Sequence, residues 1–438
     1  MSLPSFLETV PAPGLGEDIY RLIADLYPLC RSITGHGVRQ SLAILQRHIP
    51  LDLHEVPTGT PVFDWVVPKE WNISDAYVMN AAGERVIDFR SSNLHVLGYS
   101  VPVATRMTLE ELKPHLFTLP DRPDWIPYRT SYYVENWGFC LSHNRLLALR
   151  EGEYEVRIDS SLTDGHLTYG EYVLEGDSAD EVLISAHICH PSLCNDNLSG
   201  VALAAFLAKA LSERSRRFTY RFLFVPGTIG SLTWLSLNRD RVSRIRHGLV
   251  AACVGDGGRF TYKRSRRGDA EVDRAVASVL RGTGRDYDIL DFSPYGYDER
   301  QYCSPGFNLP VGVLSRTPHG RFPEYHTSAD DLDFVRPAHL AESFAVYLSV
   351  LNLLEGDRRY LNTHPYGEPQ LGRRGLYRAI GGQADAPAAE LAMLWVLNLS
   401  DGGHSLLDIS DRSQLPFELI RRAAVTLAEH GLLEVVAA

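Results

Sequence analysis

The stretch that decides the fold of this chain runs from residue 181 to residue 207 and reads EVLISAHICHPSLCNDNLSGVALAAFL. Its first five residues form a short aliphatic run that is typical of a buried β-strand. The Ala- and Leu-rich segment from 198 to about 211 predicts a helix, with Asp196 and Asn197 where a cap is expected. Polar side chains therefore occupy a strand-to-helix crossover, which is where ligands bind in open α/β sheets.

This crossover carries His187, His190 and Asp196. Imidazole nitrogen and carboxylate oxygen are good ligands for first-row metals, and zinc is the first expectation for a mixed set. The alternative is that the histidines are ordinary hydrogen-bonded loop residues. Their clustering beyond a buried strand favours the metal.

Three further apolar runs, residues 220–225, 249–254 and 309–314, also read as buried strands with polar residues beyond their ends. Asp256 follows the second of these runs in a glycine-rich turn, and His326 lies beyond the third. We therefore predict a set of two histidines and two carboxylates, shared by one or two metal ions, that consists of His187, Asp196, Asp256 and His326.

Five segments carry a resemblance to a known family, namely SAHICHPS (185–192), NDNLSG (195–200), TIGS (228–231), GYDERQYCSPG (296–306) and EYHTSADD (324–331). They resemble segments of the zinc aminopeptidases of clan MH. They are more closely similar to a bacterial group of aminopeptidase-like proteins that carry an inserted β domain and a C-terminal winged helix. The resemblance covers nearly the whole chain. It implies an α/β fold, an aminopeptidase-like α/β/α sandwich around a mixed sheet.

The resemblance also implies roles for individual residues. It makes His187, Asp196 and Asp256 the ligands of one zinc ion, with Asp196 bridging to a second metal held by His326. The implied reaction is hydrolysis of an amide bond next to a free amino group. A metal supports this reaction because it lowers the pKa of bound water and polarises the carbonyl.

The chain departs from the family pattern at two positions. Related sequences carry a glutamate in the turn after the second strand, as the expected proton carrier or ligand, whereas this chain has Gly227. Loss of a general base typically lowers the rate by about 10² to 10⁴. The second departure is Tyr297, where a small residue is more familiar.

The sequence offers other candidates for the role of the glutamate that is absent at position 227. Glu299 and Glu324 are the candidate catalytic carboxylates, and Tyr325 is a candidate donor to an oxyanion. Candidates for binding the charged ends of a substrate are Asp298, Arg300 and Arg316.

The pattern of the chain predicts three domains. An aminopeptidase-like α/β domain is expected over residues 1–50 and 153–364, with two amphipathic helices in 19–46. Short alternating runs at 76–79, 94–97 and 131–134, broken by Pro, Gly and Asp, predict a β-rich insert over 51–152. Three helices and a terminal strand predict a winged helix over 365–438.

Composition and charge limit the kinds of partner and the cellular compartment that we expect. The net charge of −11 disfavours nucleic acid, because phosphate binding needs concentrated Lys and Arg. The amino terminus has no secretory pattern, no apolar run is long enough for a membrane span, and none of the six cysteines forms a CxxC pair. We therefore expect a cytoplasmic protein with free thiols, which acts on a small amino-acyl or peptide-like substrate; a homo-oligomer stays open.

Three functions remain after these steps. The first is a zinc-dependent, aminopeptidase-like amide hydrolase, impaired to the extent that Gly227 matters. The second is a catalytically silent metal-binding protein that serves recognition, scaffolding or regulation. The third is a cyclising or acyl-transferring enzyme on the same fold.

Overall fold

The computed structural model describes residues 13–376 and 386–436, and within them the chain forms two compact units. The first unit contains residues 13–270 and 286–345. The second contains residues 271–285 and the described residues from 346 onward. No helix in the described ranges has the length and apolar character needed to cross a membrane.

The first unit is built on an eight-stranded sheet with the order β1-β10-β12-β11-β13-β16-β14-β15. The sheet is mixed: β12, β11, β13 and β16 run parallel to one another, whereas β1, β10 and β14 introduce antiparallel pairs. The strands are β1 (Asp52–Pro57), β10 (His166–Leu174), β11 (Glu181–His187), β12 (Thr219–Val225), β13 (Ile245–Ala251), β14 (Phe260–Lys263), β15 (Tyr287–Leu290) and β16 (Val311–Ser315).

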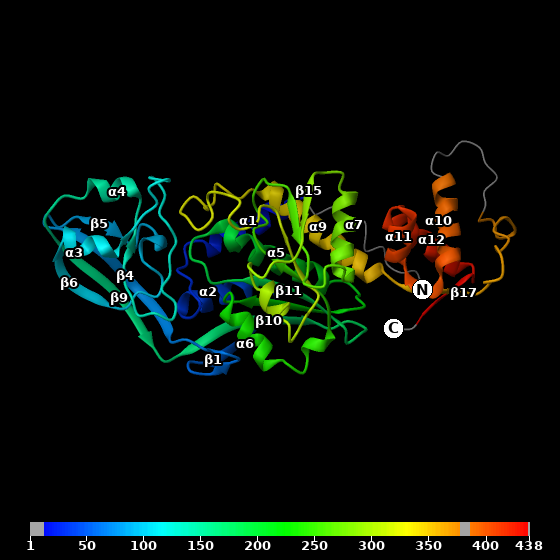
Figure 1. The fold of residues 1–438 in the computed structure, drawn as a ribbon, viewed down its shortest axis with the longest axis horizontal. Helices are drawn as coiled ribbons and strands as arrows, with labels where there is room; N and C mark the ends of the chain where they lie inside the picture. The colour runs from blue at the N-terminus through cyan, green and yellow to red at the C-terminus, as the bar shows by residue number, and fades with distance from the viewer. Residues whose placement is uncertain (1–12, 377–385, 437–438) are drawn as a thin grey trace. The chain divides into compact units, whose positions relative to one another are not determined.

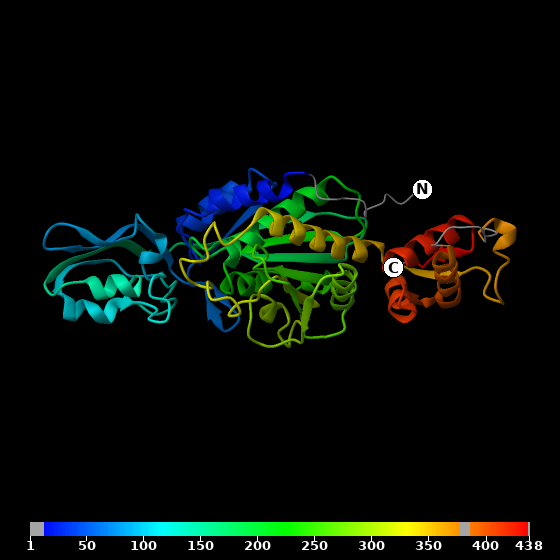
Figure 2. The same ribbon diagram turned by 90° about the horizontal axis from the view of Figure 1, so that it is seen from above.

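Every residue of β11 and β12 is buried, which requires that both faces of the sheet are covered. Figures 1 and 2 show helices on both sides of the sheet. The helices of this unit's core are α1 (Leu15–Leu26), α2 (His36–Leu45), α5 (Gly200–Ser212), α6 (Ile229–Leu237) and α8 (Glu299–Tyr302). Helix α9 (Pro337–Gly356) begins in the first unit and ends in the second. The predicted α/β/α arrangement around a mixed sheet is confirmed.

A smaller sheet lies in the first half of the chain, with the order β5-β4-β9-β6. Its strands are β4 (Glu70–Asn80), β5 (Arg85–Asp88), β6 (Val103–Thr108) and β9 (Glu153–Thr163). Short elements accompany it: β2 (Pro61–Val62), β3 (Trp65–Val66), α3 (Leu109–Leu112), β7 (Leu116–Phe117), β8 (Phe139–Cys140) and α4 (His143–Ala148). Within the range 51–152, β1 pairs with the large sheet, and β9 follows residue 152 yet belongs to the small sheet.

The second unit contains α7 (Glu271–Gly282) and a three-stranded sheet of β17 (Arg359–Asn362), β18 (Asp401–Ser405) and β19 (Leu433–Val435). Its other helices are α10 (Ala386–Leu399), α11 (Leu406–Ser413) and α12 (Phe417–Glu429), as the sequence predicts for a winged helix. On α12, Arg421 pairs with Glu418 at 2.8 Å and Arg422 approaches the same carboxylate at 3.8 Å. Two acids on this helix, Glu418 and Glu429, equal its two arginines in number.

Two details of the sequence prediction are wrong. The third predicted strand ends at Ala251 rather than Val254, because the chain turns at Cys253, whose φ is 53°. In the insert, the run from 94 to 97 is a 3-10 turn over Asn93–His95 rather than a strand, and residues 131–134 form no strand.

Candidate metal centre

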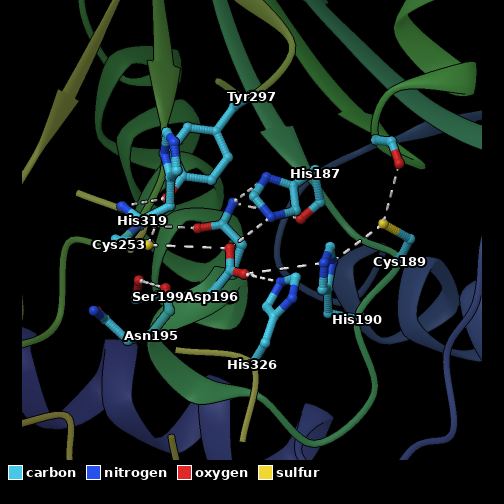
Figure 3. A network of polar contacts seen from close by, with 12 residues as sticks. His187, Cys189, His190, Asn195, Asp196, Ser199, Cys253, Tyr297, His319 and His326 are labelled. Carbon is cyan, nitrogen blue, oxygen red and sulfur yellow. Dashed lines mark hydrogen bonds and ion pairs between the residues drawn. The ribbon is translucent and has the colours of Figure 1, made fainter. Parts of the chain in front are cut away.

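Three histidines surround the carboxylate of Asp196 at the carboxyl ends of the parallel strands (Figure 3). His187 Nε2 lies 2.9 Å from Asp196 Oδ1. On the other oxygen, Oδ2, His326 Nε2 lies at 2.9 Å and His190 Nε2 at 3.9 Å. The ligand atoms of His187, His190 and Asp196 all lie within 4.8 Å of one another, so one ion can contact all three. The structure thus brings His187, Asp196 and His326 together as predicted and adds His190.

Exposure across the cluster shows the side from which a ligand can approach. The side chain of Asp196 is 0% exposed and that of His187 is 4% exposed. The exposed fraction rises to 15% for His190 and 33% for His326. A ligand therefore reaches the cluster from the side of His326 and His190.

The turn after β11 has an irregular backbone that presents Asp196 to the histidines. Helical hydrogen bonding spans Cys194–Ser199, yet the dihedral angles of Asp196 (φ −112°, ψ 83°) and Asn197 (φ −143°, ψ 32°) are not helical. Asn197 ties this turn to the end of β13, since its Nδ2 donates to Ala251 O at 2.9 Å and its Oδ1 accepts from Cys253 N at 3.2 Å. The expectation that Asp196 and Asn197 cap helix α5 is therefore replaced by a role in shaping the cluster.

A buried carboxylate holds the same turn from the other side. Asp330 Oδ1 accepts from the backbone N–H of Asn195 at 2.6 Å, and its Oδ2 accepts from the N–H of Asp196 at 2.9 Å. Asp330 is 0% exposed, and burial raises its pKa to about 8. Asp330 thus orients Asp196 through the backbone of the turn, which is the position of an outer-shell partner in metal sites.

The charges of the cluster depend on one another. Burial opposes ionisation of Asp196, but His190, His187 and His326 outweigh it and hold the pKa of Asp196 well below its ordinary value. Burial also opposes protonation of His187, yet the hydrogen bond to Asp196 and the nearby carboxylates raise its pKa. Burial lowers the pKa of His190 well below the ordinary value, which favours the neutral imidazole that metals bind.

Asp256 is not part of the cluster, contrary to the sequence prediction. Its Oδ1 accepts from Gly258 N at 2.6 Å and from Thr317 Oγ1 at 2.6 Å. Its Oδ2 accepts from Asn195 Nδ2 at 2.9 Å and Thr317 N at 3.2 Å. Because β13 ends early, Asp256 lies beyond the turn and ties loops together.

Two predicted substrate-site residues serve as internal braces instead. Arg316 is buried, where it pairs with Glu342 at 3.1 Å and donates to the carbonyl of Gly258 at 3.0 Å. Glu299 is 0% exposed and pairs with Lys263 at 2.7 Å. Lys263 holds Oε1 of Glu299, whereas Oε2 is buried with no hydrogen-bond partner in the described part of the chain.

The remaining candidates lie at different distances from the cluster. The ring of Tyr325 stacks on His326 at 3.9 Å, which places it at the open side. The guanidinium of Arg300 lies 6.0 Å from the ring of Tyr295. Glu324 contributes its backbone carbonyl, which accepts from Thr327 Oγ1 at 2.7 Å, and its side chain makes no contact with the cluster in the described ranges.

Asp298 lies beside the position of the missing glutamate. A Cβ atom at Gly227 would lie 3.0 Å from His187 Cβ, 3.5 Å from Asp298 Oδ2 and 3.6 Å from Asp298 Oδ1. Ser231 Oγ donates to Asp298 Oδ1 at 2.8 Å, while Oδ2 is buried with no hydrogen-bond partner in the described part of the chain. Burial raises the pKa of Asp298. A carboxylate with one free oxygen therefore occupies the space next to Gly227.

A segment of the insert range lies against the cluster. Tyr128 N donates to His326 O at 2.8 Å, and Ser328 N donates to Ile126 O at 2.9 Å. The ring of Tyr128 contacts the rings of both His190 and His326, with centroids 5.1 Å apart in each case. These contacts restrict the space through which a ligand can reach the imidazole nitrogens of His190 and His326.

Replacing Asp330 with alanine is expected to destabilise the protein by about 2–6 kcal/mol, because two buried N–H groups each lose an acceptor worth roughly 1–3 kcal/mol. Zinc affinity should fall roughly 10- to 100-fold, as for other outer-shell partners. Urea unfolding and zinc titration measure the two effects.

The neighbouring Asp331→Ala is the matched control for Asp330→Ala. Asp331 Oδ1 also accepts from two backbone N–H groups, those of Asp333 and Phe334, but in a more exposed setting. The variant Asp331→Ala should leave zinc affinity unchanged. Equal loss of affinity in both variants would contradict the role given to Asp330.

The large mixed sheet, the helices on both faces and the histidine–aspartate cluster define an aminopeptidase-like α/β protein with a C-terminal winged helix. Residues 20–357 match the model of a family described as a domain of unknown function, DUF4910, and residues 358–435 match a winged helix-turn-helix model. The chain belongs to the DUF4910 family.

Two comparisons with Clostridium acetobutylicum cover almost the whole chain. A protein named "Putative polysaccharide biosynthesis protein with aminopeptidase-like domain" is 56% identical over 421 residues, 96% of this chain and 97% of that protein. A crystal structure of a "putative peptidase" matches with a TM-score of 0.92 and 55% identity, over 96% of each chain.

More distant structures share the fold of the first unit. BSAP, a zinc aminopeptidase from Bacillus subtilis, matches with a TM-score of 0.57 and 12% identity over 78% of this chain and 95% of that chain. A peptidase M28 precursor from Shewanella amazonensis matches with a TM-score of 0.55 and 15% identity, over 78% of this chain and 93% of that chain. The predicted resemblance to zinc aminopeptidases is thus confirmed for the fold.

Proposed function

We propose that this chain is a metal-dependent amide hydrolase of the aminopeptidase type, acting on a small amino-acyl or peptide-like substrate. The observation that carries the proposal is the convergence of His187, His190 and His326 on the buried carboxylate of Asp196, at the ligand-binding edge of an aminopeptidase-like sheet. Imidazoles and one carboxylate are the donor set that zinc prefers in hydrolytic sites.

These four residues would hold the metal, which we propose to be zinc. When bound, zinc polarises an amide carbonyl and makes bound water acidic enough to attack near neutral pH. The protein holds Asp196 in place through the hydrogen bonds from Asn195 N and Asp196 N to Asp330. His326 and Tyr325, stacked at 3.9 Å, form the side at which the substrate enters.

Asp298 is the residue that we propose to carry the proton in place of the missing glutamate. Its partner-free Oδ2 lies in the space that a side chain at Gly227 would enter, next to His187. Burial raises its pKa, which moves the group toward the range in which a general base can both accept and return a proton. The ion pair with Lys263 makes Glu299 a poorer candidate.

The substrate is proposed to be small or to present a chain end. The backbone pairing of residues 126–128 with residues 326–328 narrows the approach to the cluster, which a long polypeptide would have to cross. The name of the Clostridium relative points to polysaccharide biosynthesis. We therefore include amide-bearing amino sugars among the substrates to be tested.

A second candidate function is metal binding without hydrolysis. Gly227 favours it, because glycine offers no group that can accept a proton or bind a metal. The two functions differ in whether the unmodified chain turns over a substrate.

The test is a hydrolysis screen with the zinc-loaded chain against amino-acyl anilides, dipeptides and N-acylated amino sugars. The proposal expects turnover that a chelator abolishes and zinc restores. If neither the unmodified chain nor Gly227→Glu hydrolyses any member, the hydrolase is refuted. Turnover only after Gly227→Glu supports the silent metal-binding protein instead.

A further inference from the structure

The predicted ligand set does not supply donors for two metal ions. A two-ion centre bridged by Asp196 requires additional ligands around each ion, since zinc normally takes four. Asp256, one of the predicted ligands, is held by Asn195, Gly258 and Thr317. Gly227 has no side chain to contribute. Among the described residues, the donors that remain within 4.0 Å of the Asp196 carboxylate are three imidazoles and the thiol of Cys253.

The Oδ1 side of Asp196 is closed by the side chains of Cys253 and Tyr297, which are hydrogen-bonded to each other. Cys253 Sγ lies 4.0 Å from Asp196 Oδ1, and the hydroxyl of Tyr297 lies 3.0 Å from that sulfur. The same hydroxyl accepts from His319 N at 3.2 Å. The ring of Tyr297 stacks on His187 with centroids 5.3 Å apart and planes 20° apart, so it fills the space beside that imidazole (Figure 3).

The opposite side of Asp196 is where imidazoles gather. His326 and His190 approach Oδ2, with their ring centroids 5.0 Å apart. The other ring nitrogen of His190, Nδ1, contacts Cys189 Sγ at 3.2 Å, which orients the ring with Nε2 toward Asp196. Ligand atoms of His187, His190 and Asp196 lie within 4.8 Å of one another, and His326 adds a third imidazole at Oδ2, so the donors match in number the four that one zinc ion takes.

We propose that the chain binds one metal ion per molecule, with His190 as a ligand, and that Tyr297 and Cys253 close the Oδ1 side of Asp196 to a second ion. The inference concerns the metal centre of the proposed function but does not depend on turnover. It differs from the two-ion set that the family resemblance implies, and it gives the departure at Tyr297 a physical role.

Metal content tests the proposal directly. The full chain is stripped with a chelator, reloaded with excess zinc, freed of unbound metal by gel filtration and measured by elemental analysis. The expected ratio is one zinc per chain. A ratio of two overturns the proposal, whatever the activity of the protein.

Substitution separates His190 from a neighbouring histidine. His190→Ala should lose zinc affinity by more than the roughly 10- to 100-fold that removal of an outer-shell partner produces. His319→Ala is the matched control, since the ring of His319 contacts that of Tyr297, with centroids 4.9 Å apart, rather than Asp196. Equal affinity of His190→Ala and wild type, with both proteins folded by circular dichroism, overturns the role of His190.

Cobalt reports on the thiol of Cys253. The cobalt-loaded chain should give a tetrahedral spectrum without a sulfur-to-metal band in the near ultraviolet, and Cys253→Ser should leave that spectrum unchanged. If such a band is present and disappears in Cys253→Ser, the thiol binds the metal, and the proposal that Cys253 closes the Oδ1 side of Asp196 is wrong. One ion without turnover would contradict the proposed function alone, and two ions with turnover would contradict this inference alone.

Discussion

Asp196→Asn is expected to empty the metal centre. The carboxylate is the group on which all three imidazoles converge, and its ionised form is favoured because His190, His187 and His326 hold its pKa well below the ordinary value. An amide removes the negative charge and one acceptor oxygen while keeping the volume. Zinc affinity should fall by more than roughly 100-fold, the upper limit for loss of an outer-shell partner. Amide hydrolysis should fall to the level of the chelated protein.

The measurement for Asp196→Asn is a zinc titration with a competing chelator, followed by elemental analysis. Glu324→Gln is the matched control, because it neutralises a carboxylate two residues from His326, and the contact of Glu324 in the described ranges is that of its backbone carbonyl with Thr327. It should bind zinc as wild type does. If Asp196→Asn retained a full zinc complement at wild-type affinity, the centre would have to lie elsewhere.

The sequence predicts β11 and β12 well because hydrophobic burial governs them. The runs that become β11 and β12 are buried at every position, and buried strands read as continuous apolar segments. The edge at which parallel strands end therefore collects His187 and the turn that carries Asp196. His326 joins them through a loop whose sequence resembles that of the zinc aminopeptidases.

The errors arise where backbone dihedrals decide the direction of a side chain. Asp256 was expected as a ligand because an apolar run reached Val254, but the left-handed turn at Cys253 ends the strand earlier and carries Asp256 away. His190 is in the opening stretch, yet its direction depends on a turn that includes Ser192 with φ 46°. Apolar periodicity contains no information about either turn.

Asp298 shows a second limit of sequence reasoning. Its proximity to Gly227 joins residues 71 positions apart, 298 minus 227, through the packing of α8 and α6. The sequence offered both Asp298 and Glu299 in one triplet, and it favoured the second as the catalytic carboxylate. Only the three-dimensional arrangement separates them, since each has one oxygen without a partner among the described residues, but Glu299 pairs with Lys263 whereas Oδ2 of Asp298 lies 3.5 Å from the position of a Cβ at Gly227.

Asp298→Asn is expected to lower kcat for amide hydrolysis by about 10² to 10⁴ while the zinc content stays at the wild-type level. The amide has nearly the same shape as the carboxylate and can still accept from Ser231, but it cannot take a proton from the attacking water. The dependence of kcat on pH gives a second measurement. A base must be deprotonated to act, and burial raises the pKa of Asp298 above its ordinary value of 3.8. Activity should therefore rise with pH along an acid limb that Asp298→Asn removes.

Glu299→Gln is the matched control, because it makes the same change one residue along, in a group bound to Lys263 rather than facing Gly227. It should keep the acid limb, even where the lost ion pair lowers stability. Gly227→Glu in the Asp298→Asn background should recover part of the rate, since a side chain there starts 3.5 Å from Oδ2 of Asp298, although His187 must shift to admit a Cβ at 3.0 Å. If kcat and the acid limb were unchanged in Asp298→Asn, Asp298 would not be the proton carrier. The carrier would then be expected at the exposed side of the cluster, where Tyr325 stacks on His326.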